Sequence, residues 1–268
     1  MNSVVIAKFG GSVIGVDGIS IPVIIQRINS LSKDAKVVAV FSAPLTVVEG
    51  KRRSLTDVAL ELGKRAEGGK AFDLIILKKT YEKILELVSS EFQEKCRTMI
   101  DDCLDVVRIE LEKAIEKKEF ADEIRSKTLA YSGEILMSYM MEYILQSQGI
   151  KSKVVGLDNW PIITDSNIES TNFLASESNK KVEFLERLLD ENQVITIGGF
   201  IGRTADGVIT TYERGGSDRT AADLGILLHK KFDVKIDLEK DSSVVSADPR
   251  IVKDGLTEVR SISYNEAR

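Results

Sequence analysis

The chain has 268 residues, of which 43% are hydrophobic and 29% are charged, so it can bury a large core. A peptide, a disulfide-rich miniprotein and a largely disordered chain are excluded. The 37 basic and 42 acidic side chains give a net charge of −5, which offers no general attraction for nucleic acid or an anionic membrane. No apolar run approaches the roughly 18 residues of a membrane span or completes an export signal. We therefore expect a cytoplasmic protein with small ligands and neither nucleic acid nor membrane as a partner.

The few cysteines and the single histidine exclude several chemistries. Cys96 and Cys103 are too few for a disulfide framework and have no zinc-like spacing, so core thiols are the favoured interpretation. His229 stands alone, which excludes a pair of imidazoles, and beside two lysines it is predicted to end a helix. We predict no protein-built metal site.

The first part of the chain predicts a strand over 4–9, a helix over 19–32 and a second strand over 36–42. A charged loop follows over 43–54, and for its Gly50-Lys51-Arg52-Arg53 run a solvated turn is favoured over a phosphate clamp. Residues 55–149 have an almost entirely helical pattern, with one apolar stripe from Phe92 to Leu111 and another from Leu136 to Ile144.

The remaining elements alternate between short strands and helices. Strands are predicted over 152–156, 161–164, 193–197, 207–212 and 233–238, and helices over 180–192 and 216–231. Such alternation is typical of an α/β fold with a mainly parallel central sheet covered by helices. Neither a repeat nor a linker interrupts residues 1–268, so we expect a single domain.

A lysine and two glycines end the first predicted strand, as Lys8-Phe9-Gly10-Gly11-Ser12. Bare backbone N–H groups beside an ammonium suit phosphate binding, although a structural Gly-Gly turn is at least as common. The spacing from Gly10 to Gly15 is that of a P-loop, but Val16-Asp17 replaces the required Lys-Ser/Thr pair, so a Walker site is rejected.

A stronger motif is Arg214-Gly215-Gly216-Ser217-Asp218, which opens a predicted helix and combines an arginine fork with a site suited to anions. Helix capping by Ser217 or Asp218 is the structural alternative. The run Gly198-Gly199-Phe200-Ile201-Gly202 ends another strand and is predicted to form a second backbone-amide cradle at the same sheet edge.

Several segments together resemble the aspartokinases of the amino acid kinase superfamily, over nearly the whole chain. In chain order they are Lys8–Ser12, Ser42–Pro44, Tyr131–Glu134, Ile163–Asn167, Gly199–Gly202, Thr210–Thr211, Arg214–Asp218, Ala247–Arg250 and Ile262–Tyr264. The resemblance implies a three-layer α/β/α sandwich and ATP-dependent phosphorylation of the L-aspartate side chain, with Mg²⁺ and self-association into a homo-oligomer. A carboxylate is already a nucleophile at neutral pH, so the lack of a histidine base is no obstacle.

The resemblance also implies roles for individual residues. Lys8 would stabilise the phosphoryl charge and Asp218 would orient Lys8. Arg214 would bind the α-carboxylate of the acceptor and Glu134 its ammonium, although Glu134 also suits an ordinary first helical turn. The remaining implied contacts are Thr56 and Ser217 with the acceptor, and Gly10, Gly11, Ser12, Gly215, Gly216, Asp248 and Arg250 with ATP.

The chain departs from the family pattern in places that border the nucleotide. Glu239-Lys240-Asp241-Ser242-Ser243 replaces the usual Thr-Asp-Val-Asp-Gly, Val245 replaces a tyrosine, and Glu213 replaces a glycine before Arg214. The sequence ends at Arg268 without the regulatory ACT domains of the family, so we expect a short catalytic domain. Two alternatives stay open: a superfamily kinase with another acceptor, and a nucleotide-binding homologue without turnover.

Overall fold

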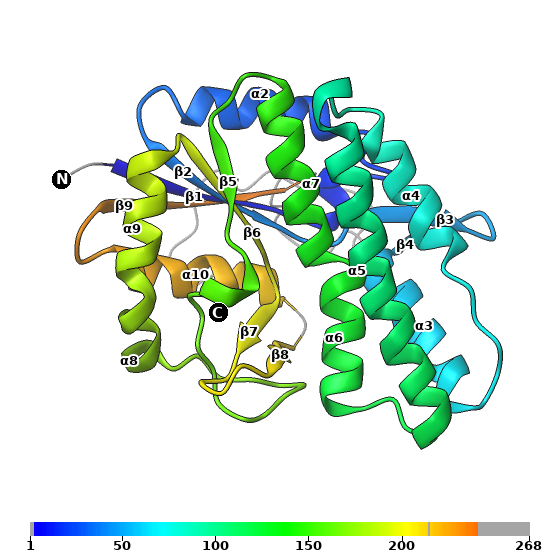
Figure 1. Cartoon of the computed structure of the whole chain (residues 1–268). Coiled ribbons are helices and arrows are strands. Elements are labelled where there is room, and N and C mark those ends of the chain that lie inside the picture. The colour runs from blue at the N-terminus through cyan, green and yellow to red at the C-terminus, as the bar shows by residue number, and fades with distance from the viewer. Residues whose placement is uncertain (1–2, 214, 241–268) are drawn as a thin grey trace, which may run out of the picture.

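A five-stranded parallel sheet forms the centre of the computed structural model, which describes residues 3–213 and 215–240 (Figure 1). The strand order is β5-β6-β2-β1-β9 and every neighbouring pair is parallel. The strands are β1 (Ser3–Phe9), β2 (Lys36–Phe41), β5 (Ser152–Val154), β6 (Val194–Gly198) and β9 (Asp233–Glu239). The predicted α/β class with a mainly parallel sheet is confirmed.

Helices cover both faces of this sheet and so make three layers (Figure 1). One face carries α2 (Ile21–Leu31), α4 (Ile75–Leu85), α5 (Ser90–Lys117) and α7 (Glu134–Ser147), and the other carries α9 (Val182–Glu191) and α10 (Gly216–Leu228). Helices α3 (Leu55–Glu67) and α6 (Asp122–Ser132) pack with α5. The short elements are α1 (Gly11–Ile14), α8 (Ala175–Ser178), η1 (Leu157–Asn159) and η2 (Asn179–Lys181).

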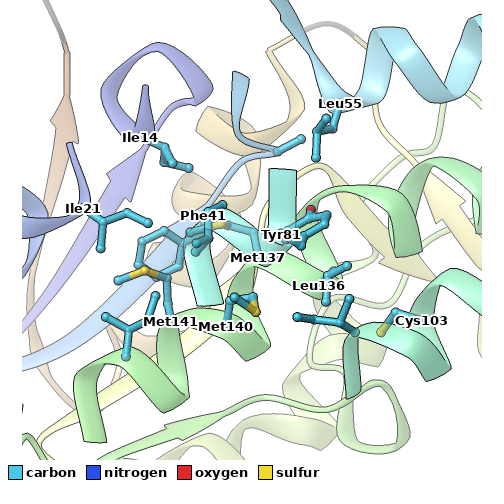
Figure 2. Packing of buried hydrophobic residues seen from close by; sticks show 14 of the residues in the cluster. Ile14, Ile21, Phe41, Leu55, Tyr81, Cys103, Leu136, Met137, Met140 and Met141 are labelled. Carbon is cyan, nitrogen blue, oxygen red and sulfur yellow. The ribbon is translucent and has the colours of Figure 1, made fainter. Parts of the chain in front are cut away.

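The two-residue period of β1 sends its side chains alternately into two cores. Val5, Ala7 and Phe9 belong to the core shared with α2 and α7, whose packing Figure 2 shows around Phe41 and Met140. Val4 and Ile6 belong to the opposite core, which contains the apolar side of α10. By the same period Lys8 points toward α10, and this sets the geometry of the site described below.

The structure corrects one predicted loop and one predicted strand, and it shortens another strand. Residues 43–54 are not a loop: β3 (Leu45–Val48) and β4 (Lys51–Ser54) form an antiparallel hairpin. Glu49 and Gly50 at its tip both have positive φ, 50° and 75°, as a tight hairpin turn requires. Residues 161–164 make only isolated bridges, not a strand. The strand expected over 207–212 is β8 (Ile209–Thr211), paired with β7 (Ile201–Arg203).

The structure confirms the expected places of the cysteines and the histidine. Cys96 and Cys103 are unbridged and buried, and burial raises the pKa of each thiol to about 12, as expected of unreactive core thiols. His229 follows the last residue of α10. Among the described residues, no helix has both the length and the apolar character needed to cross a membrane.

Candidate active site

A cavity of about 230 Å³ opens at the carboxyl edge of the sheet, where β1 and β2 end and where α3, α7 and α10 begin. Ligands of open α/β sheets bind at this edge because strand ends and helix N-termini converge there. The cavity is lined by Lys8, Ser42, Thr56, Glu134, Phe200, Gly215, Gly216, Ser217 and Asp218.

Lys8 and Asp218 form an ion pair in the wall of this cavity. The Lys8 Nζ lies 2.9 Å from Asp218 Oδ1, without the angles of a good hydrogen bond, and Lys240 Nζ lies 3.3 Å from the other carboxylate oxygen. Partial burial favours protonation of Asp218, but the charges of Lys8 and then Lys240 outweigh it and lower the pKa of the carboxyl. A carboxylate is therefore held ionised beside a nearly buried ammonium.

Glu134 also lines this cavity and has a buried carboxylate oxygen without a partner in the described part of the chain. It is the first residue of α7, only 4% exposed, and its Oε2 has no hydrogen-bond partner in the part of the chain that the structure describes. Burial raises the pKa of Glu134 to about 7, and contacts with nearby backbone and with Thr56 offset only part of that effect. A first-turn carboxylate of a surface helix would be solvated, so the ordinary structural interpretation does not account for this one.

The start of α10 is held by packing and not by a side-chain cap. Gly215 precedes the helix with φ 82°, a conformation that favours glycine, and no side-chain hydrogen bond caps the helix within the described residues. Ser217 instead shares a 2.9 Å hydrogen bond with Ser42, and Asp218 pairs with Lys8. Capping by Ser217 or Asp218 is therefore wrong.

The turn after β6 does not form the expected amide cradle. The Gly199 N–H donates to Phe41 O at 2.8 Å and the Phe200 N–H donates to the Thr220 hydroxyl at 3.0 Å, so neither donor is left for a ligand. Gly199 is needed for close packing, because a Cβ there would lie 2.5 Å from the Ser217 side chain. Phe200, with φ 69°, turns into the cavity wall.

The turn after β1 lies directly beside the ammonium of Lys8. A Cβ on Gly10 would come within 3.1 Å of Lys8 Nζ, and one on Gly11 would lie 2.6 Å from the Ala43 carbonyl oxygen. Ser12 is exposed on the short helix α1. These three residues flank the cavity without lining it, and the tight glycine positions keep the backbone close to Lys8.

A second cavity, of about 760 Å³, shares Thr56, Phe200 and Gly215 with the first. Arg125 and Glu169 form an ion pair at 2.7 Å in its wall. Glu213, whose charge next to Arg214 departs from the family pattern, accepts a 2.7 Å hydrogen bond from Ser170 there. The extra carboxylate is thus tied to a neighbouring loop.

The fold brings together most of the site residues that the sequence singles out, on one cavity. Arg214, Asp248 and Arg250 lie outside the described residues, as does the segment 241–243. Ser42 and Phe200 also line the cavity, although the sequence analysis assigned no binding role to either side chain. Ser42 could have been predicted, because a polar residue directly after the buried run of β2 stands at the carboxyl edge of the sheet. Phe200 could not, because a phenylalanine gives no indication of the positive φ that turns it into the cavity wall.

No cluster of three or more His, Cys, Asp or Glu side chains suited to a metal ion occurs in residues 3–213 and 215–240. The residues around Lys8 do fit the phosphates of a nucleotide, because two ammonium groups and a glycine turn without space for side chains meet there.

Comparison with known proteins identifies the family of the chain. The model of the amino acid kinase family matches residues 3–268. The aspartokinase of Rickettsia felis is 32% identical over 136 residues, which are 50% of this chain and 32% of that protein. The aspartokinase of Geobacillus stearothermophilus is 34% identical over 140 residues, which are 52% of this chain and 32% of that protein.

A solved structure of E. coli aspartokinase III in complex with aspartate and ADP superposes with a TM-score of 0.73 at 21% identity, which shows the fold. The superposed region comprises 96% of this chain and 53% of the E. coli chain. This chain thus spans about half of that structure and about a third of the two aspartokinases above. Since the family model matches nearly all of the sequence, the chain belongs to the amino acid kinase family.

Proposed function

We propose that this protein is an aspartate kinase, which transfers the γ-phosphoryl group of ATP to the side-chain carboxylate of L-aspartate and gives 4-phospho-L-aspartate and ADP. The observation that carries the proposal is one cavity with two opposite features. It is lined by the Lys8–Asp218 ion pair and by the buried carboxylate of Glu134, one oxygen of which has no partner among the described residues. Such a site suits a donor rich in negative charge and an acceptor with an ammonium group.

The reaction needs alignment and charge neutralisation more than proton transfer. An oxygen of the aspartate side chain attacks the γ-phosphorus, the bond to the bridging oxygen breaks, and ADP leaves with that electron pair. Because the attacking carboxylate is already ionised, no base has to remove a proton. His229, the one histidine, lies at the far end of α10, and its absence from the cavity is compatible with this chemistry.

Lys8 would stabilise the charge that develops on the transferred group, and Asp218 would hold its ammonium in place. Gly10, Gly11 and Ser12 would bind phosphate oxygens from one side, and Gly215 and Gly216 at the start of α10 from the other. Mg²⁺ would neutralise the phosphate oxygens when bound. We extend the nucleotide site to Asp248 and Arg250 on the family pattern alone.

The acceptor would be held by its two amino-acid groups. Glu134 would face the ammonium, and a bound cation would favour the ionised form of this carboxyl. Arg214 stands in sequence between Glu213 and Gly215, which line the larger cavity, and would bind the α-carboxylate with its planar fork. The hydroxyls of Thr56 and Ser217, both in the cavity wall, would complete the polar contacts.

Trapping of the acyl phosphate tests the proposal. With MgATP, L-aspartate and hydroxylamine, the protein should form aspartyl hydroxamate in proportion to ADP. No hydroxamate at any ATP concentration would refute it. ATP binding in the absence of turnover would favour the nucleotide-binding homologue.

A kinase of the same family with a larger acceptor is the second candidate, because the 760 Å³ cavity opens beside Thr56 and leaves room beyond an aspartate. A panel of acceptors that extends from aspartate and glutamate to longer amino acids would distinguish the two. We also expect a single cytoplasmic catalytic domain from the sequence, and self-association from its resemblance to the family.

A further inference from the structure

We propose that Lys240 is a second phosphate-binding residue of this site, whose ammonium binds the phosphate tail of ATP beside Lys8. The inference rests on the proposed function in taking ATP as the donor, and it does not depend on the acceptor. It concerns the segment in which the chain departs from the family pattern, where Lys240 stands in the place of an aspartate.

The register of the sheet brings Lys240 beside the cavity, next to Asp218. Strand β9 runs parallel to β1, with Leu238 opposite Lys8 and Glu239 opposite Phe9. Lys240 follows directly and is thus level with the start of the Gly10-Gly11 turn. The two-residue period of a strand places it on the same face as Leu238, which is the face covered by α10.

Contacts on both faces of β9 support this placement. On the α10 side, a Cβ on Gly225 would lie only 2.8 Å from Ile236 Cδ1, so Ile236 contacts the helix even though its side chain is partly exposed at the edge of the sheet. On the opposite side, Arg27 of α2 forms ion pairs with both Asp237 and Glu239. The end of β9 is therefore held from α2, and Lys240 is directed to the first turn of α10.

The resulting cluster has an excess of positive charge. Lys8 Nζ lies 2.9 Å from one oxygen of Asp218, and Lys240 Nζ lies 3.3 Å from the other. One carboxylate thus lies between two ammonium groups and neutralises one of them. The Lys240 side chain is 48% exposed, and an ion pair as exposed as this one contributes little to the stability of the fold.

A phosphate chain supplies the negative charge that this cluster lacks. The glycine turn after β1 brings backbone close to Lys8 on one side, and Gly215, which has open space where a side chain would stand, precedes α10 on the other. An ATP tail that lay along this backbone would meet Lys8 near the cavity and Lys240 at the adjoining strand end. Lys240 would then strengthen binding of the tail, whereas Lys8 would act on the group in transfer.

Calorimetric titration of the full chain with MgATP tests this role. Lys240→Met removes the charge and keeps most of the stem, and Lys240→Arg keeps the charge. Lys235→Met is the matched control, because Lys235 is exposed on the other face of the same strand. We expect ATP affinity to fall about tenfold in Lys240→Met, as for a lost charge-assisted contact. It should change by no more than about threefold in Lys240→Arg and stay unchanged in the control, with AMP affinity unaffected throughout.

Wild-type affinity for ATP in Lys240→Met would overturn the inference, as would equal losses in the methionine and arginine variants or parallel losses of ATP and AMP affinity. If the variants show the expected differences in ATP affinity but the wild-type protein forms no aspartyl hydroxamate, the proposed function fails and the role of Lys240 stands. If hydroxamate forms and Lys240→Met binds ATP normally, only the present inference fails.

Discussion

Replacement of Glu134 by glutamine should change how stability depends on pH. The carboxyl is buried and its pKa in the folded protein is about 7, against an ordinary value of 4.5. Folding therefore favours the protonated form, and wild-type stability should fall as the pH rises from about 4.5 to 7 and then level off. Glutamine has nearly the same shape and no charge, so the variant should lack this component.

The size of the effect follows from the shift. One pKa unit corresponds to about 1.4 kcal/mol, so a rise from 4.5 to about 7 corresponds to about 3 kcal/mol. Below pH 4.5 the two proteins should be similar in stability, and above pH 7 Glu134→Gln should be more stable by up to that amount. Urea unfolding of both proteins at several pH values between 4 and 8.5 measures the difference directly.

The same substitution should weaken acceptor binding, because the ammonium of aspartate would lose its carboxylate partner. In the wild type the KM for aspartate should fall as the pH rises toward 7 and Glu134 ionises, and in Glu134→Gln this dependence should vanish. A stability difference that is constant across the pH range would refute the reasoning about burial, whatever the kinetics show.

Three further predictions concern Lys8, Arg214 and Gly199. Lys8→Ala should lower kcat about a hundredfold or more in the hydroxamate assay, since a stabilising group of the transition state is lost; a change in KM alone would make Lys8 a binding residue. Arg214→Lys should mainly raise the aspartate KM, because an ammonium cannot replace a planar fork, and a lower kcat at unchanged KM would contradict that role. Gly199→Ala should cost about 1–3 kcal/mol of stability in urea unfolding, as its Cβ would lie 2.5 Å from the Ser217 side chain, and wild-type stability would show that this contact is misjudged.

The sequence predicted the sheet well because its strands carry buried, β-branched runs. The β-branched run of β1 indicated the strand and placed Lys8 near its carboxyl end, and the long apolar stripe of α5 indicated its buried side. Motifs at strand ends could be assigned to one edge because parallel strands share their carboxyl edge. The cavity that contains Lys8, Glu134 and Asp218 follows from that rule.

Other features depended on contacts that no local pattern encodes. The hairpin of β3 and β4 has a Glu49-Gly50 tip and a basic second strand, so the usual turn and alternation signals were absent. The amides after β6 were expected to face a ligand, but the Phe41 carbonyl and the Thr220 hydroxyl accept their hydrogen bonds. The position of Lys240 beside the site depends on the register between β9 and β1, which no local pattern in the sequence indicates.

The most direct test of the proposed reaction follows oxygen atoms. L-Aspartate labelled with ¹⁸O in its side-chain carboxylate is incubated with MgATP, the protein and hydroxylamine, and the phosphate released by hydroxylamine is analysed by mass spectrometry. If the carboxylate attacks the γ-phosphorus, each phosphate released together with hydroxamate carries one ¹⁸O atom. Unlabelled phosphate, released at the rate of ADP formation, would mean that water is the acceptor and would contradict the account.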